Sequence, residues 1–360
     1  MASISVSKSH CLFFCGSTVC IFNFIKNNIE FTENIKDTLD EIYITCAAID
    51  STFQLFALST NAKNIYIYKF RNGEWTKILG EALTKPATSL LINSDNILIS
   101  DKSGRVVQME FNGNQKVILG TVSIITDIAL NSHYLLSADR EKKIRVSLYP
   151  NVYNIHGFLF GHKGAVTCMK ILSANNNLCC SGGCYNHICL WNIAECKLLS
   201  SIYLADIQTE SSFIMSLAEN SSSQFIAFTS ESKTIYIFTA LSNKLELTKT
   251  LLSEFSVLSC GYFINLNAFI VSLDSNNESS SFKMIVLADG DWSLLQLHSS
   301  ITNVLPLKEL QCNKNNIHIL KTLPLQFTAE STLHEEYFKR KADRIEMSSR
   351  DSKFPKSLLE

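Results

Sequence analysis

Charged side chains are scarce in this chain of 360 residues. Asp, Glu, Lys and Arg together make up 18% of it, against roughly 25% in ordinary soluble domains, while hydrophobic residues make up 46%. A chain of this composition buries a large core, which excludes wholesale disorder. The 32 basic and 33 acidic side chains leave a net charge of -1. Binding to nucleic-acid phosphates requires clustered Lys and Arg. This charge balance therefore excludes nucleic-acid binding over the whole surface and leaves only a local contact or one shared with another protein.

Long apolar runs are also missing. No stretch reaches the roughly 18 uninterrupted apolar residues of a membrane helix, and Lys8 and His10 interrupt the N-terminal segment. We therefore expect neither a signal peptide nor a membrane helix. Without a secretory signal, the twelve cysteines indicate a reducing compartment, cytosol or nucleus, in which thiols serve as small apolar side chains.

Motifs for nucleotide cofactors and for zinc are absent as well. Neither G-x-G-x-x-G nor G-x-x-x-x-G-K-[ST] occurs in the chain. The densest set of metal-ligand residue types is Cys179, Cys180, Cys184, His187 and Cys189. This set contains no C-x-x-C pair, so core packing is favoured over a metal site. We expect no catalytic residue, no cofactor and no metal in this chain, and binding is the default role of such a protein.

Short apolar strands, separated by polar turns, fill the chain up to about residue 330. One type of strand recurs at intervals of 46, 41, 38, 44, 47 and 49 residues. Its seven copies are Val19–Phe22, Ile65–Tyr68, Val106–Met109, Ile144–Ser147, Ile188–Trp191, Ile235–Phe238 and Met284–Leu287. This spacing is typical of the four-stranded blade of a β-propeller, with about 40 to 45 residues per blade. We predict an all-β, seven-bladed propeller over residues 1–330, with Ile4–Ser7 or Ile317–Leu320 as the strand that closes the ring.

The fifth copy resembles a WD repeat, with Gly161–His162 at its opening and Trp191–Asn192 at its close. Asn192 replaces the usual Asp. Tyr185 occupies the place of the Asp that binds the imidazole of the Gly-His pair in a well-formed repeat, so we expect that hydrogen-bond network to be broken. His162 and Ser181 could suggest a catalytic base and a nucleophile, but in this context they are interpreted as structural. The other six copies lack the Trp, so the repeats are degenerate.

Two charged turns occupy equivalent places in the third and fourth blades, Ser100–Gly104 and Ser137–Ser147. Alternation along the second segment puts Lys143, Arg145 and Ser147 on one side of the strand, which predicts a basic ridge backed by Asp139. The alternative is a solvated hairpin with a local ion pair that contributes less than about 1 kcal/mol.

Three segments carry a family resemblance: Ile99–Gly104, Leu136–Ser147 and Leu159–His162. Together they resemble the non-catalytic WD-repeat subunit of the tRNA (guanine-N7)-methyltransferase complex, most strongly over residues 97–192. The resemblance implies a scaffold that forms a heterodimer with a separate catalytic subunit. That partner uses S-adenosylmethionine to methylate N7 of guanine in the variable loop of tRNA. A nuclear location is implied, with the cytoplasm also open.

The resemblance also implies which residues bind the catalytic subunit. Arg145 and Asp139 would form a charged network that faces the catalytic subunit, and Lys102, Arg140 and Lys143 would lie nearby. A desolvated Arg fork binds a carboxylate of a partner with two parallel hydrogen bonds.

Helix signals appear only near the C-terminus. A capping box and an apolar stripe predict an amphipathic helix over residues 331–347, followed by a disordered tail over 348–360. In the family a basic helix here approaches tRNA, and the candidate phosphate contacts are Lys339, Arg340, Lys341 and Arg344. A solvated helix packed on the propeller is an equal alternative, because residues 331–360 hold seven basic and six acidic side chains.

Two other function classes remain open. The first is a general protein-interaction propeller, such as a substrate adaptor of a ubiquitin ligase. Such adaptors often carry Trp-Asp-x-Arg at a blade close, whereas Trp191–Ala194 lacks both the Asp and the Arg. The second is an enzyme with a site in the central channel, which would need converging carboxylates or histidines from several blades.

Overall fold

The structure is a computed structural model, and it describes residues 2–6, 10–23, 26, 28–36, 42–204, 213–220, 222–229, 233–241, 243–253, 257–263, 268–273, 282–288 and 291–296. Every regular element within these ranges is a β-strand. No helix that could cross a membrane occurs in this part of the chain.

Seven antiparallel, four-stranded sheets follow one another along the described chain, and each is built from four consecutive strands. The strands, sheet by sheet, are β1 (Ala2–Val6), β2 (His10–Cys15), β3 (Thr18–Asn23) and β4 (Asn28–Asn34); β5 (Ile44–Ile49), β6 (Leu55–Thr60), β7 (Asn64–Arg71) and β8 (Glu74–Ala82); β9 (Ala87–Ile92), β10 (Asn96–Asp101), β11 (Arg105–Glu110) and β12 (Gln115–Gly120); β13 (Ile125–Leu130), β14 (Tyr134–Asp139), β15 (Lys143–Leu148) and β16 (Ile155–Phe160); β17 (Val166–Ile171), β18 (Leu178–Gly183), β19 (His187–Asn192) and β20 (Lys197–Tyr203); β21 (Ile214–Glu219), β22 (Gln224–Thr229), β23 (Thr234–Leu241) and β24 (Lys244–Leu252); β25 (Val257–Phe263), β26 (Ala268–Leu273), β27 (Phe282–Ala288) and β28 (Asp291–Gln296).

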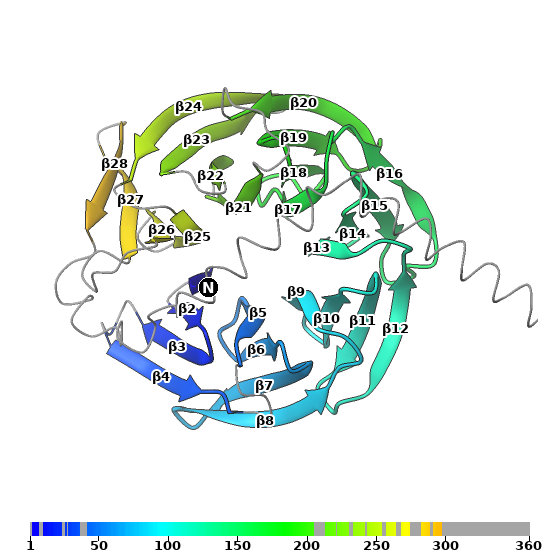
Figure 1. The fold of residues 1–360 in the computed structure, drawn as a ribbon, viewed down its shortest axis with the longest axis vertical. Helices are drawn as coiled ribbons and strands as arrows, with labels where there is room; N and C mark the ends of the chain where they lie inside the picture. The colour runs from blue at the N-terminus through cyan, green and yellow to red at the C-terminus, as the bar shows by residue number, and fades with distance from the viewer. Residues whose placement is uncertain are drawn as a thin grey trace, which may run out of the picture.

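The sheets stand around a central axis as the blades of a propeller (Figure 1). The first strand of each sheet lies nearest the axis and the fourth lies at the circumference. Each of the seven recurring segments predicted from the sequence falls on the third strand of a sheet, from β3 to β27. The prediction of an all-β, seven-bladed propeller is therefore confirmed.

The ring closes where β1 packs against β25. β1 is the innermost strand of the first sheet, and the last sheet is complete with β25 to β28. The predicted closing segment Ile4–Ser7 overlaps β1, which pairs with β2 of its own sheet. The other candidate, Ile317–Leu320, lies outside the described residues. Within the described part of the chain, no strand is exchanged between the first and last sheets.

The hydrophobic core lies between neighbouring sheets. One buried cluster joins Leu190 of the fifth sheet to Phe225 and Phe238 of the sixth, and another joins Ile21 of the first sheet to Phe56 of the second. Ten cysteines, among them Cys11, Cys20 and Cys179, are free thiols, and most of these ten are buried. These thiols fill the core as small apolar side chains, as predicted.

The fifth sheet keeps part of the WD-type hydrogen-bond network. The indole Nε1–H of Trp191 donates to Ser181 Oγ at 2.7 Å, and His162 Nε2 lies 2.7 Å from the same oxygen. Nδ1 of His162, however, is buried and has no hydrogen-bond partner. The network is thus interrupted where Tyr185 replaces the Asp, as expected, and intact between the other three residues. Because Ser181 is fully buried, it cannot serve as a nucleophile for an external substrate.

In four sheets the residue immediately before the third strand has a positive φ. Lys63, Gly104, Lys142 and Asn186 have φ angles of 66°, 82°, 70° and 52°. Only at Gly104 is a side chain also sterically excluded, because a Cβ there would lie 2.4 Å from the carbonyl oxygen of Ser123. The backbone conformation therefore favours glycine at this turn, and the lack of space requires it.

We expect Gly104→Ala to lower the free energy of unfolding by more than about 1 kcal/mol, because alanine is disfavoured at positive φ and its methyl group would meet backbone oxygens. Chemical denaturation of the purified chain measures this loss. The matched control is Lys142→Gly, which relaxes the same φ in the next sheet and should leave stability unchanged or raised. Wild-type stability of Gly104→Ala would contradict the expectation.

Candidate functional site

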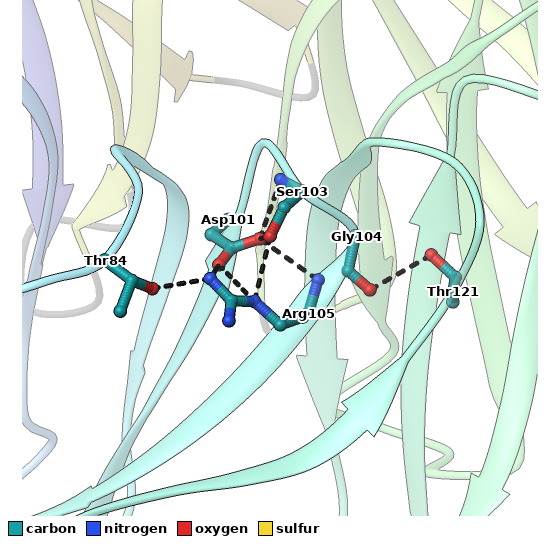
Figure 2. A network of polar contacts seen from close by, with 6 residues as sticks. All are labelled: Thr84, Asp101, Ser103, Gly104, Arg105 and Thr121. Carbon is teal, nitrogen blue, oxygen red and sulfur yellow. Dashed lines mark hydrogen bonds and ion pairs between the residues drawn. The ribbon is translucent and has the colours of Figure 1, made fainter. Parts of the chain in front are cut away.

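The charged turn of the third sheet is organised by the buried carboxylate of Asp101 (Figure 2). Its Oδ1 accepts hydrogen bonds from Ser103 N at 2.8 Å, Ser103 Oγ at 2.6 Å and Arg105 N at 3.1 Å. Its Oδ2 accepts from Nε of Arg105 and pairs with Nη2, both at 3.1 Å. Nη2 of Arg105 also donates to Thr84 Oγ1 in the loop before β9. The carboxylate thus closes the turn and ties it to a neighbouring loop.

The fourth sheet repeats this arrangement with Asp139 and Lys143. Oδ1 of Asp139 accepts from Glu141 N at 2.8 Å and more weakly from Lys143 N at 3.4 Å. Nζ of Lys143 lies 2.9 Å from Asp139 Oδ2 and 3.1 Å from Glu141 Oε2. Both turns therefore join an acidic residue at the end of the second strand to a basic residue four positions later.

Burial and the ion pair act in opposite directions on the pKa values of Asp139 and Lys143. Burial raises the pKa of Asp139 above its ordinary value, although Lys143 and the backbone amides act to lower it. Burial acts to lower the pKa of Lys143, but its hydrogen bonds to Asp139 and Glu141 outweigh burial and raise that pKa. The ammonium group of Lys143 is thus matched by two carboxylates within its own turn.

Arg145 does not join Asp139 in one charged network, and this part of the prediction is wrong. Nε of Arg145 donates to Ser147 Oγ at 2.9 Å, and Nη2 donates to the carbonyl oxygen of Val152 at 3.0 Å. Val152 lies in the loop between β15 and β16, at the end of the hairpin opposite the turn that follows Asp139. Burial lowers the pKa of Arg145, whose guanidinium is half-buried.

The predicted basic ridge is only partly formed. Lys143 and Arg145 are half-buried on β15, but Ser147 is fully buried and Leu148 is exposed. A β-bulge between Val146 and Ser147 in the pairing with β16 ends the simple alternation of buried and exposed positions. The prediction that Ser147 lies on the ridge with Lys143 and Arg145 is therefore wrong.

Lys102 and Arg140 follow the two buried aspartates at equivalent positions. The backbone N–H of Lys102 donates to Pro86 O at 3.3 Å, and that of Arg140 donates to Ile124 O at 3.2 Å. The side chain of Lys102 is exposed, and that of Arg140 is half-buried. Both cations lie at the same end of neighbouring sheets, as predicted.

An apolar surface that sequence reasoning missed lies on the outer edge of the fourth sheet. We call it the fourth-sheet edge and define it by Leu148, Tyr153, Ile155, Phe158 and Phe160. Tyr153 is 70% exposed and Phe160 is 66% exposed, and the rings of Phe158 and Phe160 stack with centroids 5.7 Å apart. In the pairing of β15 with β16, Arg145 lies opposite Phe158 and Lys143 lies opposite Phe160. The structure thus places the predicted cations beside exposed aromatic side chains.

The family model described as the tRNA methyltransferase TRM82 WD40 domain matches residues 107–297, just over half of the chain. The chain belongs to this family. The match begins in the third sheet and includes the whole fourth sheet, with Asp139, Lys143, Arg145 and the fourth-sheet edge.

Individual relatives of this TRM82-family chain carry consistent names. It is 31% identical over 138 residues to the tRNA (guanine-N(7)-)-methyltransferase non-catalytic subunit TRM82 of Meyerozyma guilliermondii, which covers 35% of this chain and 33% of that protein. It is 30% identical over 201 residues to the non-catalytic subunit wdr4 of Dictyostelium discoideum, which covers 49% of this chain and 39% of that protein. The chain thus spans about a third to two fifths of the length of these relatives.

Solved structures show the same fold in more distant chains. A chain in the crystal structure of the mitotic checkpoint complex aligns with a TM-score of 0.66 at 14% identity, covering 82% of this chain and 87% of that one. At that identity the similarity concerns the fold alone.

The residues predicted at the C-terminus lie outside the described part of this TRM82-family chain. This holds for the helix over 331–347, the tail over 348–360, and the four candidate tRNA contacts Lys339, Arg340, Lys341 and Arg344.

We expect Asp101→Ala to destabilise the chain more than Asp139→Ala. Removing Asp101 leaves the backbone N–H groups of Ser103 and Arg105, the hydroxyl of Ser103 and the guanidinium of Arg105 without their acceptor, at a cost of about 2 to 4 kcal/mol. Asp139 accepts fewer hydrogen bonds, so we expect about 1 to 2 kcal/mol. Denaturant unfolding of both variants in parallel measures the difference. An equal or reversed order would show that the recorded contacts do not determine the stability of these turns.

Proposed function

We propose that this chain is a non-catalytic scaffold that binds and stabilises the catalytic subunit of a tRNA (guanine-N7)-methyltransferase. The observation that carries the proposal is the match of the TRM82 WD40 domain to residues 107–297. Relatives from a yeast and an amoeba, both named as non-catalytic subunits of this enzyme, support it. In this proposal the partner binds S-adenosylmethionine and transfers the methyl group to N7 of guanine in the tRNA variable loop. The propeller holds the partner in its active shape.

The fourth sheet supports a docking surface for that partner. Large apolar side chains in contact with water are favourable to bury, at about 25 cal/mol per Å², and clusters of them beside polar groups are typical of interaction sites. The fourth-sheet edge supplies aromatic anchors, and Arg145 supplies a polar one. Of the five N–H donors of a guanidinium, Arg145 uses two within the described structure, on Ser147 and Val152. The remaining donors suit a carboxylate of the catalytic subunit.

The two charged turns have a different part in this scheme. Asp139 and Lys143 form an ion pair with each other, and this pair fixes the shape of the turn beside the docking surface. Lys102 and Arg140 extend from neighbouring turns and add positive charge at that end of the sheets. This arrangement favours a partner surface that is acidic opposite the third and fourth sheets.

Contact with tRNA is a separate part of the proposal. With a net charge of -1, the chain alone has no general affinity for phosphates, so tRNA would be bound by the complex. Lys339, Arg340, Lys341 and Arg344 are the proposed contacts of this chain. A nuclear location, with the cytoplasm as a second site, follows from the same proposal.

Reconstitution tests the function directly. The purified catalytic subunit is assayed for guanine-N7 methylation of total tRNA with and without this chain. The scaffold proposal expects a clearly higher rate when both are present. Equal rates would reject it in favour of a general protein-interaction propeller.

We expect Arg145→Leu to weaken binding to the catalytic subunit by about 30-fold or more, since loss of one side of a desolvated ion pair costs about 2 to 5 kcal/mol. The measurement is the dissociation constant of the purified pair, with the thermal midpoint of the variant as a check on folding. Arg71→Leu is the matched control, because Arg71 is exposed at the end of β7 in the second sheet. Unchanged binding by a folded Arg145→Leu would remove Arg145 from the interface.

We expect Phe160→Ser to weaken the same interaction by about tenfold, because an exposed aromatic anchor on the fourth-sheet edge would no longer be buried. The control is Leu252→Ser on β24, since Leu252 is 80% exposed on the sixth sheet, away from the proposed surface. Equal effects of the two substitutions would place the partner elsewhere on the ring.

A further inference from the structure

Three metal-ligand side chains meet just beneath the surface of the fifth sheet. One nitrogen of His162, one nitrogen of His187 and Sγ of Cys189 all lie within 4.8 Å of one another, and all three side chains are buried. Among the residues that the structure describes, no other group of three or more His, Cys, Asp or Glu side chains is placed to share an ion. Sequence spacing did not reveal this group, because His162 comes from the loop before β17 and the other two from β19.

The broken WD-type network leaves one ring nitrogen of His162 without a hydrogen-bond partner. His162 Nδ1 is buried without a hydrogen-bond partner, in a repeat where Tyr185 replaces the expected acceptor. Ser181 Oγ already accepts a hydrogen bond from Trp191 and can also accept one from Nε2–H of His162. In that tautomer the Nδ1 lone pair is free to bind an ion. A histidine ligand usually donates its other N–H in this way, which fixes the ring.

The distances suit a three-coordinate ion. With ligand bonds of about 2.0 to 2.3 Å, two ligands of a planar three-coordinate site lie about 3.5 to 3.7 Å apart. Cys189 Sγ lies 3.6 Å from Nε2 and 3.8 Å from Nδ1 of His187, which places the sulfur over the ring. The His187 ring stacks on Tyr203, with ring centroids 4.4 Å apart and planes 10° from parallel. A turn of the His187 ring and a shift of His162 by about 1 Å complete the triangle.

The electrostatics select the charge of the ion. An imidazole binds a metal ion in its neutral form, and a cysteine binds it as the thiolate. Nζ of Lys163, 5.1 Å from the ring centroid of Tyr203, adds positive charge to the surroundings. A monovalent cation bound to one thiolate and two neutral rings gives a site with no net charge, which burial favours. A divalent cation would leave one uncompensated positive charge.

We propose that His162, His187 and Cys189 form a binding site for monovalent copper, a soft ion that thiolate and imidazole ligands favour. The Cys189 thiol releases its proton to solvent as the copper–sulfur bond forms, and the copper keeps its oxidation state. The ion then joins the loop before β17 to β19, at the place where the missing acidic residue would have held His162. This proposal does not depend on the proposed function.

A competition experiment tests the site. The purified full-length chain is incubated without oxygen with monovalent copper and bathocuproine disulfonate, a coloured chelator that competes for the ion. We expect the wild-type chain to retain one equivalent and its thermal midpoint to rise. Because one proton is displaced, the apparent affinity should increase about tenfold per pH unit between pH 6.5 and 7.5.

Substitutions of the ligands identify the site. Cys189→Ala and His187→Phe should each lose the retained equivalent, and the phenylalanine keeps the stacking on Tyr203. Cys180→Ala is the matched control, because Cys180 is equally buried on the neighbouring strand but belongs to the core on the opposite face of the sheet. The control should retain copper as the wild type does.

Three results would overturn the proposal. The first is that the wild-type chain yields all its copper to the chelator. The second is that Cys189→Ala and His187→Phe retain as much as Cys180→Ala. The third is that Zn²⁺, tested with its own coloured chelator, is retained while monovalent copper is not. The wild-type measurement decides the matter even if a variant fails to fold.

Discussion

The structure depends on one constraint: each sheet can bury its faces only against the sheets on either side of it. The buried clusters accordingly join residues of adjacent sheets, as Leu190 and Phe225 do between the fifth and sixth. A single blade would expose two apolar faces and an edge on each side, which would favour aggregation. Closure of the ring removes most of this exposure. Each sheet is therefore held in place by a hydrophobic core that it shares with its two neighbours.

Polar contacts near the axis strengthen this packing. Asp127 on β13 accepts hydrogen bonds from Ser89 Oγ of the third sheet at 2.8 Å and from Met169 N of the fifth sheet at 2.9 Å. Burial raises the pKa of this carboxyl above its ordinary value. Thr126 Oγ1 donates to Val166 O at 2.6 Å, which also crosses from the fourth sheet to the fifth. These bonds fix the angle between sheets that the apolar contacts alone would leave adjustable.

Much of this architecture could be predicted from the sequence, because strand spacing is a local property. The third strand of every sheet and the interruption of the network at Tyr185 followed from residue order alone. The partners of Arg145 did not, because one of them, the carbonyl of Val152, lies in the loop between β15 and β16, whose path residue order does not give. The Asp101–Arg105 pair was missed although its spacing matches that of Asp139 and Lys143. The fourth-sheet edge was missed because alternation does not tell which apolar side chains of an outer strand stay uncovered.

The seam between β1 and β25 gives the ring a mechanical asymmetry. Six junctions between neighbouring sheets are bridged by the polypeptide itself, because the chain runs directly from one sheet into the next. At the seventh junction, within the described residues, no strand crosses, and β1 and β25 meet by packing alone. Within the described residues, separation of the first and seventh sheets would therefore break packing contacts alone, whereas the polypeptide ties every other pair of neighbouring sheets together. This junction lies on the far side of the ring from the fourth sheet (Figure 1).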